Sequence, residues 1–252
     1  MLKLISVNIE MDMHHDTAIP FLQKENADIV CVQEIFKQDI GMYEEALGMK
    51  SYFEPMAYTM SYKFGGKQDK IYGVAIFTKH KAEVHFSNIV GNEKEIPLLM
   101  MPKDREKERD NSRRVVLWVD INILNNAYRV ATTHFTWTPP PGISTLYQKE
   151  DARKLIQILD QDLKEFIIVG DFNAPRGKET FQMFAEKYKD NIPLEYNSSL
   201  DLKLHRSLEI RSGERSNMVD GLFTTPEYKV IDCKLIDSVS DHKAVVANIE
   251  RI

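Results

Sequence analysis

The chain has few of the features that mark secreted or membrane-spanning proteins. Its 252 residues include only two cysteines, Cys31 and Cys233, and each lies within an apolar run. This placement favours reduced core thiols over a disulfide or a metal pair. No stretch approaches the roughly 18 consecutive apolar residues of a membrane span, and the N-terminus lacks the basic region and cleavage site of a signal peptide. We therefore expect a cytoplasmic protein without a membrane span.

An excess of positive charge is also missing. The formal net charge is −5, which argues against a protein that coats long nucleic acids through bulk charge. A local basic groove or a bound metal ion could still attract a phosphate. No repeats occur, and the one compositional break, residues 91–113, contains mixed charges typical of a solvated loop. We expect a single domain over residues 1–252 and a monomer.

Short runs rich in Val, Ile, Thr and aromatic residues dominate the chain and predict many strands. Helices are predicted after Asp16, with Pro20 in the first turn, from near Gln38, and from Ser144 to about Lys164 with Ser144 as the cap. Many strands with few helices favour an α+β sandwich of two packed sheets with helices outside. The predicted strands are 2–9, 28–35, 71–78, 114–124, 128–135, 165–172, 218–225, 228–236 and 243–250.

Ionisable and amide side chains recur at or near the ends of these predicted strands. Residues two apart on a strand face the same side, so Asp171 and Asn173 should point together if strand geometry continues through them. Converging carboxylates would repel one another unless a cation neutralised them, and Mg²⁺ prefers such oxygen ligands. The residues concerned are Asn8, Gln33, Glu34, His134, Asp171, Asn173, Asp220, Asp241 and His242.

Each of these residues also has an ordinary explanation when it is taken singly. Asn8 could be a turn residue, and "DFNAP" could be an Asx-turn that closes a strand. Asp241 could bond its own backbone amides, Gln33 and Glu34 could be the exposed end of a strand, and His134 could be a packed imidazole. The conjunction of so many such residues favours a functional site.

Six short blocks, taken in order, resemble the endonuclease/exonuclease/phosphatase superfamily, which includes DNase I-like nucleases, inositol polyphosphate 5-phosphatases and sphingomyelinases. The resemblance spans residues 8 to 242 and implies a four-layer αββα sandwich of two mixed sheets flanked by helices. It also implies phosphoester hydrolysis with Mg²⁺ or Mn²⁺. The blocks are "SVN" (6–8), "VQE" (32–34), "TTH" (132–134), "GDFN" (170–173), "VDGLF" (219–223) and "SDH" (240–242).

The resemblance assigns a metal-binding role to three residues. Glu34 is similar to the principal metal ligand of the family, and Asn8 and Asp241 match positions close to the metal or its waters. Asp171 resembles the residue that activates the attacking water, although some accounts of the family make it a second metal ligand. Asn173 resembles the residue that steadies the phosphate.

Two histidines complete the set that the resemblance implies. His242 looks like a phosphate contact or general acid that Asp220 orients, and a carboxylate partner would raise the pKa of His242 and keep it cationic. His134 matches a position that is histidine in some members and tyrosine in others. An arginine before the strand 114–124 is similar to a phosphate-contacting arginine, and either Arg113 or Arg114 could be that residue.

The loops near this site leave the substrate open. Trp137 precedes three prolines and could stack on a base or cover the core. Lys63, Lys67 and Lys70 could attract an anion or keep a hairpin soluble. His14 and His15 could be metal ligands, but a solvated loop is expected. A phosphodiesterase acting on nucleic acid or its ends is the first hypothesis. A phosphomonoesterase or lipid-headgroup phosphodiesterase is the second, and a catalytically silent binding module is the third.

Overall fold

The computed structural model describes residues 1–60, 69–92, 94–99, 111–138, 142–207 and 217–252. Lys63, Lys67 and the three prolines of 139–141 lie outside these ranges, as does most of the charged run before Arg113. The helices are α1 (His15–Glu25), α2 (Ile40–Leu47), α3 (Leu146–Ile158), which continues as a π-helical turn (Leu159–Leu163), and α4 (Glu179–Ala185), with a 3-10 turn at Lys37–Asp39.

The described strands form two sheets of six. One has the order β11-β12-β1-β2-β4-β3 and the other β5-β6-β7-β8-β10-β9. The strands are β1 (Leu2–Asn8), β2 (Ile29–Phe36), β3 (Lys50–Met60), β4 (Asp69–Thr78), β5 (Ala82–Val90), β6 (Arg114–Ile123), β7 (Asn126–His134), β8 (Ile167–Asp171), β9 (Lys189–Asp190), β10 (Asp220–Thr224), β11 (Tyr228–Ile236) and β12 (Ala244–Arg251).

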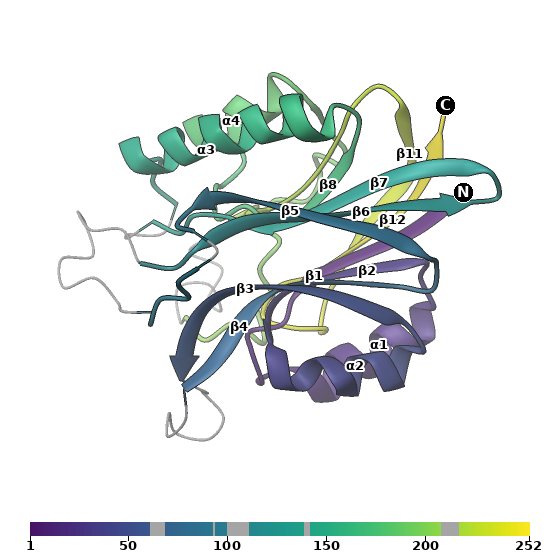
Figure 1. Cartoon of the computed structure of the whole chain (residues 1–252). Helices are drawn as coiled ribbons and strands as arrows, with labels where there is room; N and C mark the ends of the chain where they lie inside the picture. The colour runs from purple at the N-terminus through teal and green to yellow at the C-terminus, as the bar shows by residue number, and fades with distance from the viewer. Residues whose placement is uncertain (61–68, 93, 100–110, 139–141, 208–216) are drawn as a thin grey trace.

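Both sheets are mixed, and they pack face to face between two pairs of helices (Figure 1). The pairs β1–β2 and β7–β8 are parallel, and the other pairs are antiparallel. Helices α1 and α2 cover the outer face of one sheet, and α3 and α4 cover the other (Figure 1). The predicted four-layer αββα sandwich is therefore confirmed.

Side-chain alternation explains why the central strands are apolar throughout. On β1, Leu4 faces the core between the sheets, whereas Ile5 faces the core beneath α1 and α2. On β2, Cys31 faces the core between the sheets and Val30 faces the core beneath the helices. Because both faces are buried, these strands have no polar side to show the usual period of two. Cys31 and Cys233 are both buried and free, as expected.

Several predicted details were wrong. Thr145 caps α3, accepting a hydrogen bond from the backbone N–H of Gln148 at 3.3 Å, whereas Ser144 accepts one from Thr180 N. Pro20 was expected in the first turn of α1, but it lies inside the helix because the helix begins at His15. Strands β3, β5 and β9 and helix α4 were not predicted.

Two expected loops also differ from the structure. Residues 91–113 were expected to be solvated, but Arg113 is only 2% exposed. His14 directly precedes α1 and His15 begins it, and their side chains are 11% and 13% exposed, so neither lies in a solvated loop. Within the described ranges, no helix combines the length and apolarity that crossing a membrane requires.

Candidate active site

Strand register places three of the predicted site residues abreast in one sheet. His134 is the register partner of Asp171 on the parallel pair β7–β8, and Asp220 is the partner of Asp171 on the antiparallel pair β8–β10. His242 arrives from the segment before β12. Its Nδ1 lies 2.8 Å from Asp220 Oδ2, and its Nε2 lies 3.8 Å from Asp171 Oδ2. The two histidines therefore flank the Asp171 carboxylate.

A β-bulge in the other sheet turns Glu34 toward the same point. The register of β2 shifts between Gln33 and Ile35, and Glu34 has a positive φ of 58°. Gln33 faces the opposite sheet and donates to Thr132 Oγ1, whereas Ile35 packs on the helix side. The extra residue lets Glu34 follow Gln33 toward the interior, which regular alternation would forbid. Gln33 and Glu34 are therefore not the exposed end of a strand, because β2 continues to Phe36 and Gln33 is fully buried.

Asn8 connects the two sheets at the site. Its Nδ2 donates to Glu34 Oε1 at 3.1 Å and to Asp171 Oδ2 at 3.2 Å, and its Oδ1 accepts from the N–H of Glu10 at 3.0 Å. One amide thus holds carboxylates from both sheets while its own orientation is fixed by backbone. Asn8 therefore makes the turn that was one explanation for it, and it also binds the carboxylates of Glu34 and Asp171.

Asn173 is held beside Asp171 by a turn rather than by strand geometry. Strand β8 ends at Asp171, and Asn173 has a positive φ of 49°. Asp171 Oδ1 accepts from Asn173 N at 2.8 Å, which makes an Asx-turn, and Asn173 Nδ2 donates to Phe135 O at 3.0 Å. The ordinary explanation of "DFNAP" is correct, and it leaves Asn173 at the site.

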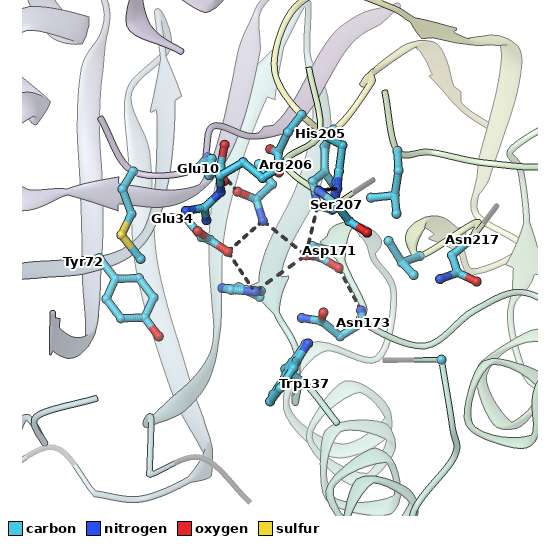
Figure 2. A pocket seen from close by; sticks show the side chains of 18 of the residues that line it. Glu10, Glu34, Tyr72, Trp137, Asp171, Asn173, His205, Arg206, Ser207 and Asn217 are labelled. Carbon is cyan, nitrogen blue, oxygen red and sulfur yellow. Dashed lines mark hydrogen bonds and ion pairs between the residues drawn. The ribbon is translucent and has the colours of Figure 1, made fainter. Parts of the chain in front are cut away.

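These side chains border one cavity of about 340 Å³ (Figure 2). Asp220 lies behind His242, and Arg113 lies elsewhere: its guanidinium pairs with Glu54 at 2.7 Å and donates to Pro55 O at 2.9 Å. Arg114 lines the cavity and donates to His134 O at 3.3 Å. Of the predicted residues, those that line the cavity are Asn8, Glu34, Arg114, His134, Trp137, Asp171, Asn173, Asp241 and His242.

A model of the Endonuclease/Exonuclease/phosphatase family matches residues 5–242. The chain belongs to this family. No curated protein matches the sequence significantly.

Solved structures share the fold of this family member at low sequence identity. A family protein from Leptotrichia buccalis has a TM-score of 0.71 and 16% identity, with 99% of this chain and 100% of that chain covered. The mannosyl-6-phosphatase Bt3783 of Bacteroides thetaiotaomicron has a TM-score of 0.63 and 16% identity, with coverages of 99% and 100%. The human Nocturnin catalytic domain with bound sulfate has a TM-score of 0.65 and 15% identity, with coverages of 100% and 94%.

The electrostatics of this family member's site leave negative charge poorly compensated. Burial raises the pKa of the Glu34 carboxyl. Burial also raises the pKa of Asp171 to about 6, where the cation of His242 opposes the rise and Asp220 adds to it. The pKa of Asp241 rises to about 6, chiefly through burial. Carboxylates that are costly to ionise in one cavity form an oxygen-rich set that a divalent cation would neutralise.

The pKa values of the two histidines shift in opposite directions. Burial and the Arg114 cation lower the pKa of His134 well below its ordinary value, so His134 is neutral near pH 7. Burial also disfavours the His242 cation, but the carboxylates of Asp220 and Asp171 outweigh it and raise the pKa of His242 well above its ordinary value. Asp220 is the carboxylate partner that was expected for His242, and the pKa shifts in the direction that this pairing predicts.

Two residues of the cavity region, Glu10 and Arg206, escaped the sequence reasoning. Glu10 is 4% exposed, pairs with His14 at 2.9 Å and contacts Arg206. Ligand atoms of Glu10, His14 and Asp241 lie within 4.8 Å of one another, as do those of Asp171, Asp220 and His242. Spacing could have found Glu10. It follows Asn8 by two residues with a φ of 48° and an Asx-type hydrogen bond, as Asn173 follows Asp171.

Proposed function

We propose that this protein is a divalent-metal-dependent phosphoesterase that hydrolyses phosphodiester bonds in nucleic acid or at nucleic-acid ends. One observation carries the proposal. Carboxylates from β2, β8 and the segment before β12 converge on one cavity beside a His–Asp pair. Buried carboxylates without a cation destabilise a fold, so their convergence is explained best by a function that uses them.

Each side chain has a role that its contacts support. His242 donates Nδ1–H to Asp220, which leaves the protonated Nε2 to face the cavity and donate to a phosphate or leaving-group oxygen. Asp171 is held by Asn8 and by the N–H of Asn173, and it accepts a proton from the attacking water. The Arg114 guanidinium and the Asn173 amide face the cavity and steady the phosphate oxygens.

Oxygen donors of the kind that Mg²⁺ and Mn²⁺ prefer line the cavity. Glu34 would hold the ion, with Asn8 and Asp241 close to it, and such an ion supplies charge stabilisation to the phosphate oxygens. His134 Nε2 lies 3.5 Å from Glu34 Oε1 and 3.6 Å from Asp171 Oδ2, so a neutral imidazole lies beside both carboxylates and adds no positive charge that would compete with the cation.

Trp137 supports a substrate with a ring next to the scissile phosphate. It lines the same cavity as Asn173 (Figure 2), and an aromatic side chain there can stack on a base. The cavity volume of about 340 Å³ and the net charge of −5 suit a chain end better than a long duplex. The sulfate bound in the Nocturnin catalytic domain adds support, because sulfate resembles a phosphate group.

A phosphomonoesterase is the second candidate. The mannosyl-6-phosphatase of similar fold and the acidic charge of this chain favour it, because a small sugar phosphate needs no extended basic groove. A lipid-headgroup phosphodiesterase would use the same residues. A silent binding module is disfavoured by the intact set, since such a protein could lose Asp171 or His242 without unfolding.

The deciding experiment is a substrate panel with Mg²⁺, with Mn²⁺ and with a chelator. It includes short single strands, RNA, plasmid, sugar phosphates, a phosphoinositide and an aryl phosphodiester. Metal-dependent turnover of nucleic acid supports the proposal, and turnover of monoester or lipid alone selects the second candidate. Asp171→Asn and His242→Ala should each lower the rate at least about 10²-fold. Asp232→Asn, an exposed carboxylate on β11, is the control, and near wild-type rates in the first two variants contradict the proposed roles of Asp171 and His242.

A further inference from the structure

Gln148 is a buried amide on α3 that the proposed reaction does not use. It is 1% exposed and sits in the first turn of the helix, after the Thr145 cap. We propose that Gln148 is a positioning residue for the active site: it holds the loops that follow β7 and β8 in the geometry that phosphoester hydrolysis requires. This inference rests on the proposed function, and its test also has a readout that is independent of turnover.

The side chain of Gln148 joins two loops that are distant in sequence. Its Nε2 donates to the backbone carbonyl of Thr136 at 2.8 Å and to that of Asn173 at 3.0 Å. Both partners can only accept, so the NH₂ group rather than the amide oxygen must face them. One side chain thus uses both of its N–H groups on the carbonyls of the two loops.

The two loops have other links, but Gln148 joins them from the helix side. Phe135 N donates to Asp171 O at 2.8 Å, and Asn173 Nδ2 donates to Phe135 O at 3.0 Å. Thr136 Oγ1 donates to Asp151 Oδ2 at 2.9 Å, one helical turn beyond Gln148. Residues three apart share a face of a helix, so α3 presents an amide and a carboxylate that together fix the loop after β7.

The positioned loops carry the substrate side of the cavity. Trp137 directly follows Thr136, and Asn173 provides both the carbonyl that Gln148 binds and the amide that faces the cavity. Asn8 and Glu34, the residues on the proposed metal side, belong to β1 and β2 and make no contact with Gln148 among the hydrogen bonds of the described chain. Loss of Gln148 should therefore disturb substrate geometry and leave metal binding unchanged.

Gln148→Met tests the inference, because methionine keeps the length of the side chain and removes both donors. Gln157→Met is the matched control, since Gln157 is exposed on the same helix. We expect kcat to fall at least about 10-fold in Gln148→Met, because small misplacements of substrate-positioning groups are costly. The Mn²⁺ concentration for half-maximal thermal stabilisation should stay within about twofold of wild type.

Acrylamide quenching of tryptophan fluorescence gives the readout that needs no turnover. The chain has two tryptophans, and Trp118 is only 7% exposed, so increased quenching in Gln148→Met reports Trp137. If the wild type hydrolyses no phosphoester, the proposed function fails, and quenching still decides whether Gln148 orders the loop. Unchanged kcat, unchanged quenching, or an equal loss of Mn²⁺ binding overturns the inference.

A second pair of variants covers the case in which Gln148→Met does not fold. Thr136→Val removes the hydroxyl that donates to Asp151 and keeps the shape of the side chain, whereas Thr136→Ser keeps the hydroxyl. We expect Thr136→Val to lower kcat and increase Trp137 quenching and Thr136→Ser to retain wild-type values. Equal behaviour of the two variants refutes the positioning role of the α3 face.

Discussion

Replacing Asp220 by Asn removes the charge opposite His242 and leaves its hydrogen bond. Asp220 Oδ2 lies 2.8 Å from His242 Nδ1, and both side chains are buried. An asparagine oxygen can still accept from Nδ1–H, so the ring should keep its position. What changes is the pKa of His242, which should fall because Asp220 is the largest of the charges that raise it.

The size of the effect follows from that distance and from burial. At an effective dielectric constant of about 20, opposite unit charges 2.8 Å apart attract by about 6 kcal/mol. Desolvation offsets much of this, and removing one partner of a buried pair costs about 3–5 kcal/mol. The Asp171 carboxylate remains 3.8 Å from His242 Nε2 and still compensates the cation. We therefore expect the free energy of unfolding to fall by about 3 kcal/mol.

The loss should depend on pH with a definite sign. The pKa of His242 is raised in the folded state, so the pair stabilises the wild type fully below the unfolded value of about 6.5 and less as pH rises through the raised pKa. Urea unfolding of both proteins should show the largest difference near pH 6 and a smaller one toward pH 10. The kcat of Asp220→Asn should fall about 10²-fold. In a plot of kcat against pH, the decrease on the alkaline side should occur at lower pH than in the wild type.

Asp237→Asn is the matched control for this experiment. It removes an Asp carboxylate close in sequence to His242, but Asp237 is 65% exposed, and its ion pair with Lys243 should contribute at most about 1 kcal/mol. A difference between wild type and Asp220→Asn that is the same at pH 6 and pH 10, or a kcat near wild type, would refute the assignment of a charged His–Asp pair.

Three further predictions concern other parts of the site. Mn²⁺ should raise the melting temperature more at pH 8 than at pH 5, because the pKa of Asp241, which lies on the proposed metal side, is raised to about 6 and the carboxyl is protonated below that pH; equal shifts in calorimetry would contradict this. Arg114→Ala should lower kcat/KM about 10²-fold, because its guanidinium lines the cavity, whereas Arg113→Ala should lose about 3 kcal/mol of stability in urea unfolding. Gly170→Ala should destabilise by at least about 2 kcal/mol in the same assay, because a Cβ there would lie 2.2 Å from Thr133 O and φ is 149°; a stable variant would show that the strands can separate.

The strands that sequence patterns failed to predict, β3, β5 and β9, are all edge strands, although the edge strand β11 was predicted. β3 and β5 end the order of their sheets, and β3 contains Pro55 at a bulge, where a strand tolerates proline. An edge strand packs against one neighbour only, so its sequence need not carry the apolar runs of a central strand. Helix α4 has only seven residues, too few for a helical period to stand out, and aromatic contacts such as Phe184 with Phe172 hold it in place.

The site was predicted as a set of residues and not as a geometry. Polar residues at the ends of apolar runs identified Asn8, Asp171 and His242, because a strand end is readable from local composition. The choice of Arg114 over Arg113 could not be read in this way. Two adjacent arginines before a strand face opposite sides, and which of them reaches the cavity depends on the register of β6 against β7.

By itself the sequence determined the buried strands, the family and the residue types of the site, because apolar patterning and short motifs are local properties of the chain. Only the tertiary structure decided the bulge that aims Glu34, the partner of His242 and the burial that raises the pKa values of the carboxylates. These depend on contacts between residues as distant as Asn8 and Asp171, and such contacts exist only once the two sheets have packed.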